Sequence, residues 1–344
     1  MASVEEKSGG GCKVFTPLKI LVTGATGLLG SELCRRLSGP HEVTGWARHV
    51  PAAGASGSAA TPACAAPGAA GRRLSAAAGG LGWKSESVDV TQVSSVQEGV
   101  NRLRPRLVVH AAAMTDVDAC EKDPASARRM NAEATGILAA ACAGAGAVLL
   151  AISTDYVFDG ASPAPYRESE TPNPISLYGR SKLKGEQEAL SLAPRVMIVR
   201  VSGLFGPARD NFVSLAARRL RAGEKVPAVT DQVNSPSYTV DLAEGIAQLI
   251  ALLERSPDAA EQGGPLHGVF HLANQGGASR LQVAEAVARI LGAPPSLILQ
   301  TRWADLDRPA RRPPQSQLDC SRFAQTVGRY LRTWEEALQA FLLN

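Results

Sequence analysis

Residues 19–30 read K-I-L-V-T-G-A-T-G-L-L-G, and this stretch decides the fold class. An apolar run leads into Gly24, Gly27 and Gly30, and a helix-like S-E-L-C-R-R-L follows. A strand–turn–helix of this kind leaves backbone N–H groups and the positive end of the helix dipole facing the space above the turn. The stretch therefore predicts a pyrophosphate site. Gly24 would permit the tight turn, Gly27 the close approach of phosphate, and Gly30 the close packing of helix on strand.

Strand-like and helix-like segments alternate along the chain, which is typical of a parallel sheet with crossover helices. We expect strands at 20–22 and 195–201, among others, with a helix from the glycine turn to about Leu37. The predicted fold class is α/β: a Rossmann-type doubly wound parallel sheet with a smaller α/β substrate-binding domain. Residues 18–205 would form the dinucleotide-binding domain. Residues 206–344 would form most of the substrate domain, partly interleaved with the first.

Two stretches fall outside this alternation. Residues 1–17 are interpreted as a flexible leader. Residues 51–82 consist mainly of Ala, Gly, Pro and Ser, with almost no large apolar side chain. Such a segment buries too little surface to offset the entropy lost on ordering. We interpret it as a low-complexity insertion between the second and third strands of the Rossmann domain.

The composition is that of a globular protein, with 45% hydrophobic and 20% charged residues. A net charge of +4, without an extended basic cluster, predicts no nucleic-acid partner. No run of eighteen apolar residues occurs, so no membrane-spanning helix is expected. The six cysteines lack metal-type spacing. We interpret them as reduced thiols of a cytoplasmic protein and expect no metal site.

Tyr178 and Lys182 stand four residues apart in S-L-Y-G-R-S-K-L-K-G-E, a spacing that puts both on one face of a helix. A free phenol has a pKa of about 10. A neighbouring ammonium and an oxidised nicotinamide favour the phenolate and lower that pKa. The pair is therefore predicted to act in acid–base chemistry, with Lys182 also holding a cofactor ribose. The alternative is a surface helix with a half-buried tyrosine.

The run A-V-L-L-A-I-S-T-D-Y-V-F, residues 147–158, is typical of a buried strand and ends in polar side chains. In open α/β sheets, ligands collect at the carboxyl ends of strands, where Ser153, Thr154 and Asp155 would stand. A threonine hydroxyl at this place can hydrogen-bond a substrate carbonyl and orient its proton transfer. The alternative is that these side chains only cap the strand or the following turn.

The choice of nicotinamide cofactor depends on the end of the second strand. NAD sites usually place an acid there, to hydrogen-bond the ribose 2′-OH. This strand instead ends T-G-W-A-R-H, without Asp or Glu. Arg48 offers a planar fork of donors for a 2′-phosphate. NADPH is therefore the predicted cofactor, with NADH possible, and the alternative is that Arg48 only opens a solvated loop.

These segments together resemble the extended short-chain dehydrogenase/reductase family, and most closely its dTDP-4-dehydrorhamnose reductase-like branch. The resemblance runs from about Lys19 to Leu342. Its further motifs are H-A-A-A-M-T-D-V-D-A-C-E (110–121), M-N-A (130–132), S-T-D-Y-V-F-D-G, L-Y-G-R-S-K-L-K-G-E and D-Q-V-N-S-P-S (231–237).

The resemblance implies a catalytic trio of Thr154, Tyr178 and Lys182, with Tyr178 as the proton donor. The implied cofactor residues, besides Arg48, are Gly24, Thr26, Gly27, Leu28, Leu29, Gly30, Asp89, Val90, Ala111, Ala112, Ala113, Tyr178 and Lys182. For Asp89 a helix cap is the alternative. The implied substrate residues are Thr115, Asp116, Ser153, Asp155, Asn211 and Gln232. Asn131 would begin a support helix beside the site.

Two further features concern the substrate. The family's reductases usually carry a bulky aromatic residue where this chain reads R-V-S-G-L-F-G (200–206), so the tryptophan that stacks on the sugar is missing and Phe205 is shifted. Arg308 and Arg311 of the late R-P-A-R-R-P-P stretch are predicted either to contact substrate phosphates or to be solvated loop residues.

The function implied is NADPH-dependent reduction of a nucleotide-linked 4-keto sugar, by hydride transfer with a tyrosine general acid. The protein would act on a small molecule, and a homodimer is an expectation. A second branch of the family is similar through the same motifs and a late L-D-C-S (318–321). That branch is the regulatory beta subunit of methionine adenosyltransferase, which implies a non-catalytic NADP-binding protein that binds the synthetase's catalytic subunit. The chain ends directly after the last amphipathic helix, and this favours the enzyme interpretation over the regulatory subunit.

Overall fold

The computed structural model describes residues 17–48 and 82–343. The predicted leader and insertion therefore lie outside the described residues, apart from Pro17 and Gly82. Within the described ranges, no helix is long and apolar enough to cross a membrane.

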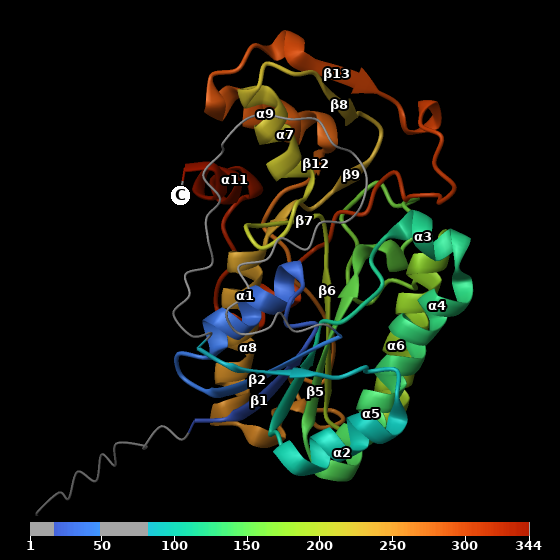
Figure 1. Ribbon diagram of the computed structural model, residues 1–344, viewed down its shortest axis with the longest axis vertical. Helices are drawn as coiled ribbons and strands as arrows, with labels where there is room; N and C mark the ends of the chain where they lie inside the picture. Colours follow the sequence, from blue (N-terminus) through green and yellow to red (C-terminus); the bar gives the residue numbers. More distant parts are fainter. Residues whose placement is uncertain (1–16, 49–81, 344) are drawn as a thin grey trace, which may run out of the picture.

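A seven-stranded, wholly parallel sheet forms the centre of the molecule (Figure 1), in the order β11-β6-β5-β4-β1-β2-β3. The order 3-2-1-4-5-6 within it is that of dinucleotide-binding folds. The strands are β1 (Lys19–Thr23), β2 (Glu42–Ala47), β3 (Lys84–Ser87), β4 (Leu107–His110), β5 (Val148–Thr154), β6 (Val196–Val201) and β11 (Gly268–His271). The predicted fold class, a Rossmann-type doubly wound sheet, is confirmed.

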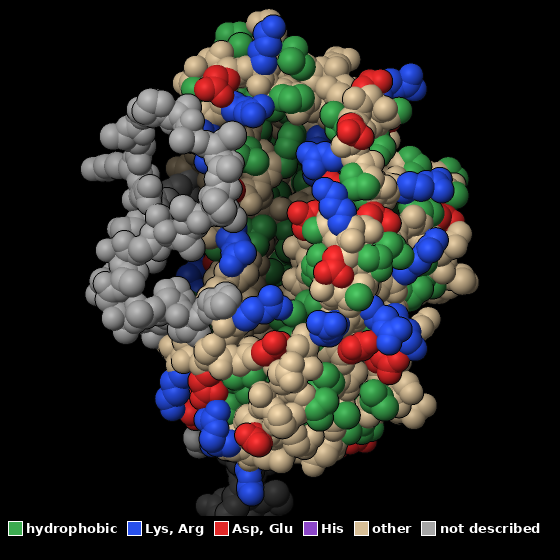
Figure 2. All heavy atoms as spheres, turned by 45° about the vertical axis from the view of Figure 1, so that its right-hand side comes forward, with side chains coloured by type: hydrophobic (Ala, Val, Ile, Leu, Met, Phe, Trp, Pro, Cys, Tyr) green, Lys and Arg blue, Asp and Glu red, His purple; other side chains and the backbone are tan. Residues whose placement is uncertain are grey.

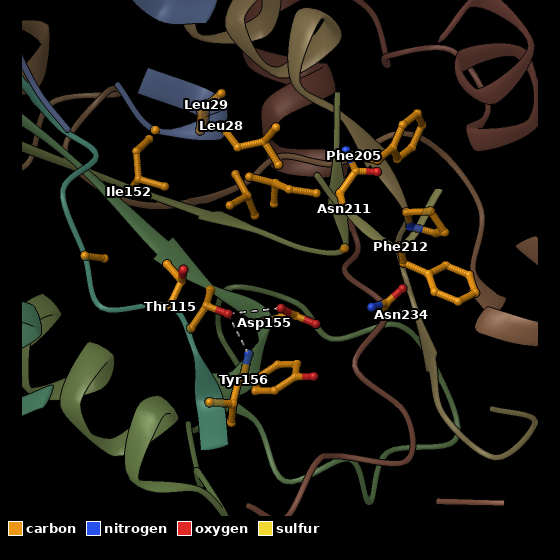
Figure 3. A pocket seen from close by; sticks show the side chains of 18 of the residues that line it. Leu28, Leu29, Thr115, Ile152, Asp155, Tyr156, Phe205, Asn211, Phe212 and Asn234 are labelled. Atoms are coloured by element: carbon orange, nitrogen blue, oxygen red, sulfur yellow. Dashed lines mark hydrogen bonds between the residues drawn. The ribbon is translucent and has the colours of Figure 1, made fainter. Parts of the chain in front are cut away.

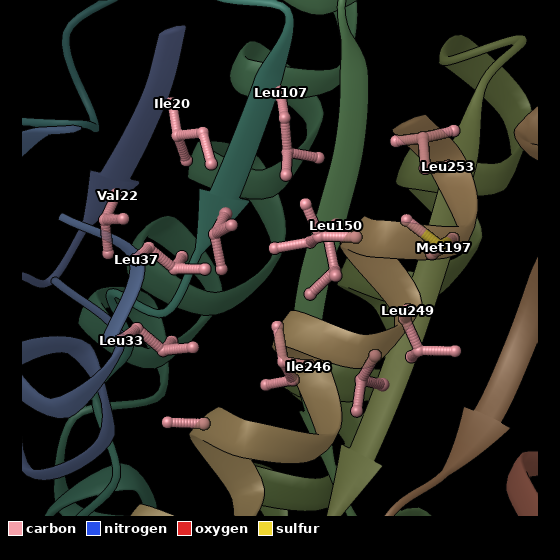
Figure 4. Packing of buried hydrophobic residues seen from close by; sticks show 14 of the residues in the cluster. Ile20, Val22, Leu33, Leu37, Leu107, Leu150, Met197, Ile246, Leu249 and Leu253 are labelled. Atoms are coloured by element: carbon pink, nitrogen blue, oxygen red, sulfur yellow. The ribbon is translucent and has the colours of Figure 1, made fainter. Parts of the chain in front are cut away.

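Helices cover both faces of this sheet. One face carries α1 (Leu28–Leu37) and α8 (Thr239–Arg255), and the other carries α2 (Val93–Leu103), α5 (Ala134–Ala145) and α6 (Leu177–Leu192). Alternate residues of each strand feed the two cores, because successive side chains point to opposite faces. Figure 4 shows Ile20, Leu107, Leu150 and Met197 of the sheet packed against leucines of α1 and α8.

A second part stands above the carboxyl ends of the strands in Figure 1 and has its own hydrophobic core. It contains α7 (Phe212–Arg221), α9 (Arg280–Leu291), α11 (Trp334–Leu343) and the strand pairs β8 (Val226–Val229) with β13 (Ile298–Thr301), β9 (Val233–Asn234) with β12 (Ala278–Ser279), and β7 (Leu204–Phe205) with β10 (Ser237–Tyr238). The division into domains stays a prediction. Between the segments of this part, the chain returns to the main sheet to form α8 and β11.

The remaining elements connect these layers. They are α3 (Val117–Lys122), α4 (Pro124–Arg128), a π-helical turn (Arg129–Glu133), α10 (Ser321–Val327) and the 3₁₀ turns Asp155–Val157, Pro257–Ala260, Pro295–Leu297 and Trp303–Asp305. A π-helical turn often marks a functional site. Here it lies between α4 and α5 and contains Asn131.

The packing of α8 on the main sheet predicts how much the free energy of unfolding falls when a side chain is removed from that core. Ile246 is fully buried between α1 and the sheet, so Ile246→Ala should lower the free energy of unfolding by about 3 kcal/mol. Urea denaturation measures this change. Leu215→Ala on α7, where the side chain is 39% exposed, is the control and should cost well below about 1 kcal/mol. A comparably small cost for Ile246→Ala would contradict the described core.

Candidate active site

The turn between β1 and α1 has the features predicted from its glycines. Gly24 has a φ of +71°, which L side chains rarely adopt, and a Cβ there would lie 2.7 Å from the backbone nitrogen of Ala112. A Cβ on Gly30 would lie 2.1 Å from the carbonyl oxygen of Gly24, so only glycine lets α1 pack this closely. Gly27 precedes α1 without a side-chain cap, and the first turn holds no acidic residue. The N–H groups of that turn are therefore available to an anion.

One cavity of about 630 Å³ joins this turn to the carboxyl ends of β4, β5 and β6 and to the second part. Figure 2 shows a hollow in the middle of this face, with hydrophobic side chains inside and Lys and Arg side chains on its border. The predicted site residues that line the cavity are Gly27, Leu28, Leu29, Gly30, Ala111, Ala113, Thr115, Ser153, Thr154, Asp155, Tyr178, Lys182 and Asn211. Figure 3 shows Leu28 and Leu29 on one side of it and Asp155 and Tyr156 on another.

Tyr178 and Lys182 project from the first two turns of α6, which Ser176 caps by accepting from the backbone N–H of Gly179. The ammonium of Lys182 donates to the carbonyl oxygen of Ile152 at 2.7 Å. Burial lowers the pKa of Lys182 to about 8, although the charge of Glu186 opposes the shift. The Lys182 side chain is therefore fixed against β5 instead of pointing into solvent.

The Tyr178 phenol lies near the Thr154 hydroxyl, and its ring meets the Tyr156 ring edge-on at 5.8 Å between centroids. Burial raises the pKa of Tyr178 above that of a free phenol, and the Thr154 hydroxyl lowers it in part. The net shift is upward, opposite to the lowering predicted from the neighbouring Lys182, and the nearby Asp155 adds to it. A neutral phenol is the protonation state of a general acid.

Asp155 lies directly behind Thr154 and is almost fully buried. Its carboxylate accepts from three hydroxyls: Thr154 at 3.1 Å, Ser202 at 2.9 Å and Ser316 at 2.5 Å. Burial raises the pKa of Asp155 to about 6, against these three hydrogen bonds. The Thr154 hydroxyl is therefore held by the Asp155 carboxylate, to which it donates, and by the backbone N–H of Tyr156, from which it accepts at 3.2 Å.

Ser153 faces a different group. Its hydroxyl donates to Glu186 at 2.5 Å, and Glu186 forms a buried ion pair with Arg200 of β6 at 2.6 Å. Arg200 also lies over the Phe158 ring, 5.1 Å from its centroid. Ser153 thus borders the cavity, but its hydroxyl donates to Glu186, which lies one helical turn beyond Lys182. The contact anchors α6 to β5.

Asn131, in the π-helical turn, is fully buried and connects two parts of the site. Its amide donates to the carbonyl oxygen of Met114 and to the Ser181 hydroxyl, both at 3.0 Å, and its oxygen accepts from the N–H of Met114 at 2.8 Å. It therefore fixes the loop after β4 against α6, next to Thr115 and Lys182.

Eight predicted residues do not line the cavity: Gly24, Thr26, Arg48, Asp89, Val90, Ala112, Asp116 and Gln232. Gly24 and Thr26 belong to the glycine turn, and Ala112 donates to the Thr23 hydroxyl beside it. Asp116 caps α3 by accepting from the N–H of Ala119. Asp89 accepts from the N–H of Thr91 in the turn before α2, whose N-cap is Gln92, so the alternative of a helix cap is wrong for Asp89. Val90 is buried in the core. Gln232 buries its Nε2 without a partner among the described residues, and the neighbouring Asn234 lines the cavity instead.

Arg48 stands exposed at the carboxyl end of β2, with no acid in the strand's last residues. Hydrogen bonds from Thr91 hold the pKa of Asp89 below its ordinary value, and the nearby charge of Arg48 lowers it further. Arg308 and its neighbour Arg312 instead form ion pairs with Asp118 at 3.1 and 3.0 Å. Arg311 borders a second, shallower pocket with Trp303.

Several cavity residues were not found from the sequence, and Arg280 is the main one. It is the first residue of α9, lies over the Phe212 ring at 5.1 Å, and has no carboxylate partner among the described residues. A cation at a helix N-terminus is electrostatically unfavourable. An arginine directly after the helix cap Ser279 was therefore the signal in the sequence that could have pointed to Arg280.

Phe205 does not replace the sugar-stacking aromatic residue that the family's reductases usually carry. Phe205 borders the cavity but is only 2% exposed, and it stacks on Tyr238 with 5.5 Å between centroids and 11° between planes. The side chain belongs to the second core and has no free face for a sugar. Leu204 and Phe212 supply the apolar wall of the cavity instead.

A Rossmann sheet, a capless glycine turn and a Tyr-x-x-x-Lys helix that meet in one cavity define a nicotinamide-dependent oxidoreductase of the extended short-chain dehydrogenase/reductase class. The chain belongs to the family described as RmlD substrate binding domain, which matches residues 18–344.

Relatives and solved structures agree with this assignment. A dTDP-4-dehydrorhamnose reductase of Streptomyces griseus is 39% identical over 252 residues, 73% of this chain and 81% of the relative. A probable dTDP-4,6-dihydroxy-2-methyloxan-3-one 4-ketoreductase of Streptomyces antibioticus is 33% identical and covers 94% of both chains. The crystal structure of a Bacillus anthracis dTDP-4-dehydrorhamnose reductase in complex with NADP superposes with a TM-score of 0.77, at 28% identity, over 95% of this chain and 99% of that one. The predicted family and enzyme class are confirmed.

The buried ammonium gives the protein a testable pH dependence. The pKa of Lys182 is about 8 in the folded chain and 10.5 when unperturbed, so between these pH values the unfolded state binds more protons. Stability relative to Lys182→Met should therefore rise with pH, by up to about 3 kcal/mol between about pH 8 and pH 10.5. Urea denaturation across this range measures the difference.

Lys184→Met on the same helix is the control. Lys184 is 58% exposed and pairs with Glu188, so its stability difference from wild type should stay flat over the same pH range. A flat or falling difference for Lys182→Met would contradict the burial described for Lys182.

Proposed function

We propose that the protein reduces the keto group of a nucleotide-linked 4-keto sugar with NADPH. The observation that carries the proposal is the single cavity that joins the glycine turn to Thr154, Tyr178 and Lys182. An anion-binding turn and a proton donor at opposite ends of one cavity suit a dinucleotide whose reactive end reaches the donor. The names of the two Streptomyces relatives, a dehydrorhamnose reductase and a 4-ketoreductase, support the substrate class.

The residues present fit a dinucleotide. The open N–H groups of α1 would bind the pyrophosphate, and Arg48 the 2′-phosphate. Ala111 and Ala113 carry small side chains along the path between the turn and β5. Lys182 would donate to the ribose next to the nicotinamide. When bound, NADPH supplies the hydride.

The protein's own residues supply the proton and hold the oxygen. Tyr178, kept neutral by burial, donates its proton to the alkoxide that develops at the reduced carbonyl. The Thr154 hydroxyl donates to Asp155 in the protein without ligands; turned toward the substrate, the same proton would be donated to the reacting oxygen and hold it beside the phenol. Lys182 stabilises the phenolate left behind until it is protonated again. Together, the hydride from NADPH and the proton from Tyr178 convert the ketone to an alcohol, so the reaction balances.

The sugar nucleotide would lie toward the second part. Arg280 at the start of α9 is a cation that faces the cavity there without a described carboxylate partner, and it suits a diphosphate. Asn234 offers an amide on the same side, as Figure 3 shows, whereas the Asn211 amide caps α7 and donates to the carbonyl oxygens of Gly206 and Arg209. Because the stacking tryptophan is missing, the sugar itself is fixed by these polar groups and by Leu204. A cytoplasmic location and a homodimer remain predictions from the sequence.

The direct test is NADPH consumption with dTDP-4-dehydrorhamnose, with NADH in parallel. Rapid, NADPH-selective turnover supports the proposal. If NADPH binds tightly but neither this substrate nor other nucleotide-linked 4-keto sugars are reduced, the proposal fails and the regulatory beta-subunit interpretation takes its place. A pull-down of a methionine adenosyltransferase catalytic subunit would then be the expected result.

Removing the phenolic hydroxyl isolates the proton step. Tyr178→Phe should lower kcat by about a hundredfold or more, because general acid catalysis contributes roughly that much. NADPH affinity should stay within about twofold, since the phenol is not the main cofactor contact. Steady-state kinetics and fluorescence titration of NADPH measure the two effects. Tyr330→Phe, at a 48% exposed position, should change neither, and retained turnover in Tyr178→Phe would contradict the mechanism.

Removing the Arg48 guanidinium tests cofactor choice. Arg48→Ala should weaken NADPH binding by about tenfold or more while leaving NADH affinity unchanged, because only NADPH carries the 2′-phosphate. Fluorescence titration with both cofactors gives the ratio. Equal losses for both cofactors, or none for either, would show that Arg48 does not recognise the 2′-phosphate.

A further inference from the structure

Arg209 lies in the loop between β7 and α7, in the second part of the molecule, yet it contacts the glycine turn of the Rossmann sheet. Its Nε donates to the carbonyl oxygen of Thr26 at 3.0 Å. Thr26 directly precedes Gly27, the N-cap of α1. The contact joins residues 183 positions apart, and Gly27 and Arg209 both line the cavity.

The charge of Arg209 is available at this place. Among the described residues, no carboxylate forms an ion pair with Arg209, and none accepts a hydrogen bond from its two Nη groups. The adjacent Asp210 pairs with Arg218 of α7 at 3.3 Å. The bond through Nε uses one donor of the guanidinium and leaves the outer donors free for a second acceptor.

The neighbouring turn supplies the other half of an anion site. The N–H groups at the start of α1 have no side-chain cap and no acidic residue beside them. Phosphate placed above this turn would therefore have helix N–H groups on one side and the Arg209 guanidinium on the other. Charge-assisted hydrogen bonds from a guanidinium are among the stronger ones that a phosphate receives.

We propose that Arg209 clamps the pyrophosphate of the bound dinucleotide from the side of the second part. The inference rests on the proposed function, because it takes a nicotinamide dinucleotide as the ligand of the turn. It adds a contact that the Rossmann sheet alone does not provide. The same loop continues into Asn211 and Phe212, which line the substrate side of the cavity, so cofactor binding also fixes the position of those two residues.

A contact to the pyrophosphate is distinguishable from one to the 2′-phosphate. The pyrophosphate is common to NADPH and NADH, so Arg209→Ala should weaken the binding of both cofactors by a similar factor, about tenfold or more. Arg48→Ala serves as the internal contrast, because it should weaken only NADPH. Arg209→Lys, which keeps the charge but loses the planar fork, should recover part of the affinity for both. Fluorescence titration of the full-length protein measures every case.

The matched control is Arg218→Ala, which removes a nearby exposed arginine outside the cavity. It should leave both affinities unchanged. Unchanged affinities in Arg209→Ala would overturn the inference, as would a loss confined to NADPH. Equal losses in Arg209→Ala and Arg218→Ala would also overturn it, because they would show that the loop acts only through its conformation. If the wild-type protein bound neither cofactor, the proposed function itself would fail.

Discussion

The buried ion pair between Glu186 of α6 and Arg200 of β6 is the interaction on which the site depends. Both side chains are less than 5% exposed, and Glu186 also accepts from Ser153 of β5. Removing one partner of such a pair leaves an uncompensated charge and costs roughly 3–5 kcal/mol. The pair therefore holds α6 in one register on two strands. Tyr178 and Lys182, two turns and one turn earlier on the same helix face, take their positions from it.

Several polar side chains then connect this helix to the rest of the cavity. Asn131 joins α6 to the loop after β4, and Asp155 joins the end of β5 to Ser202 and to Ser316 of the late chain. The arrangement places a neutral phenol, a hydroxyl and a buried ammonium around one point. A buried carboxylate behind Thr154 also explains why the threonine hydroxyl has a fixed direction before any ligand is bound.

The sequence predicted what depends on local patterns. The glycine turn, the buried strand ending at Thr154 and the four-residue spacing of Tyr178 and Lys182 are all short-range signals, and the parallel sheet follows from their alternation. Contacts between distant segments gave no such signal. Arg209 sits in an irregular G-P-A-R-D-N loop, and Arg280 reaches the cavity only because α9 folds above the sheet.

Polar residues beside a motif proved the hardest to interpret from sequence. Asp89 and Asp116 cap turns or helices, and Ser153 bonds Glu186, because short polar side chains satisfy nearby backbone and charged groups as readily as ligands. The direction of the Tyr178 pKa shift could also be determined only from the structure. The sequence showed the neighbouring ammonium and so predicted a lowered pKa, but it did not show the burial, which raises that pKa.

The central claim is that one cavity brings a hydride donor and a keto sugar to the Thr154–Tyr178 pair. The most direct measurement is deuterium transfer from NADPH that carries deuterium at both C4 positions of the nicotinamide to a nucleotide-linked 4-keto sugar, followed by NMR of the product. Deuterium is expected on the former keto carbon, delivered to a single face. A reduced product without deuterium at that carbon, or with deuterium on both faces, would contradict the claim.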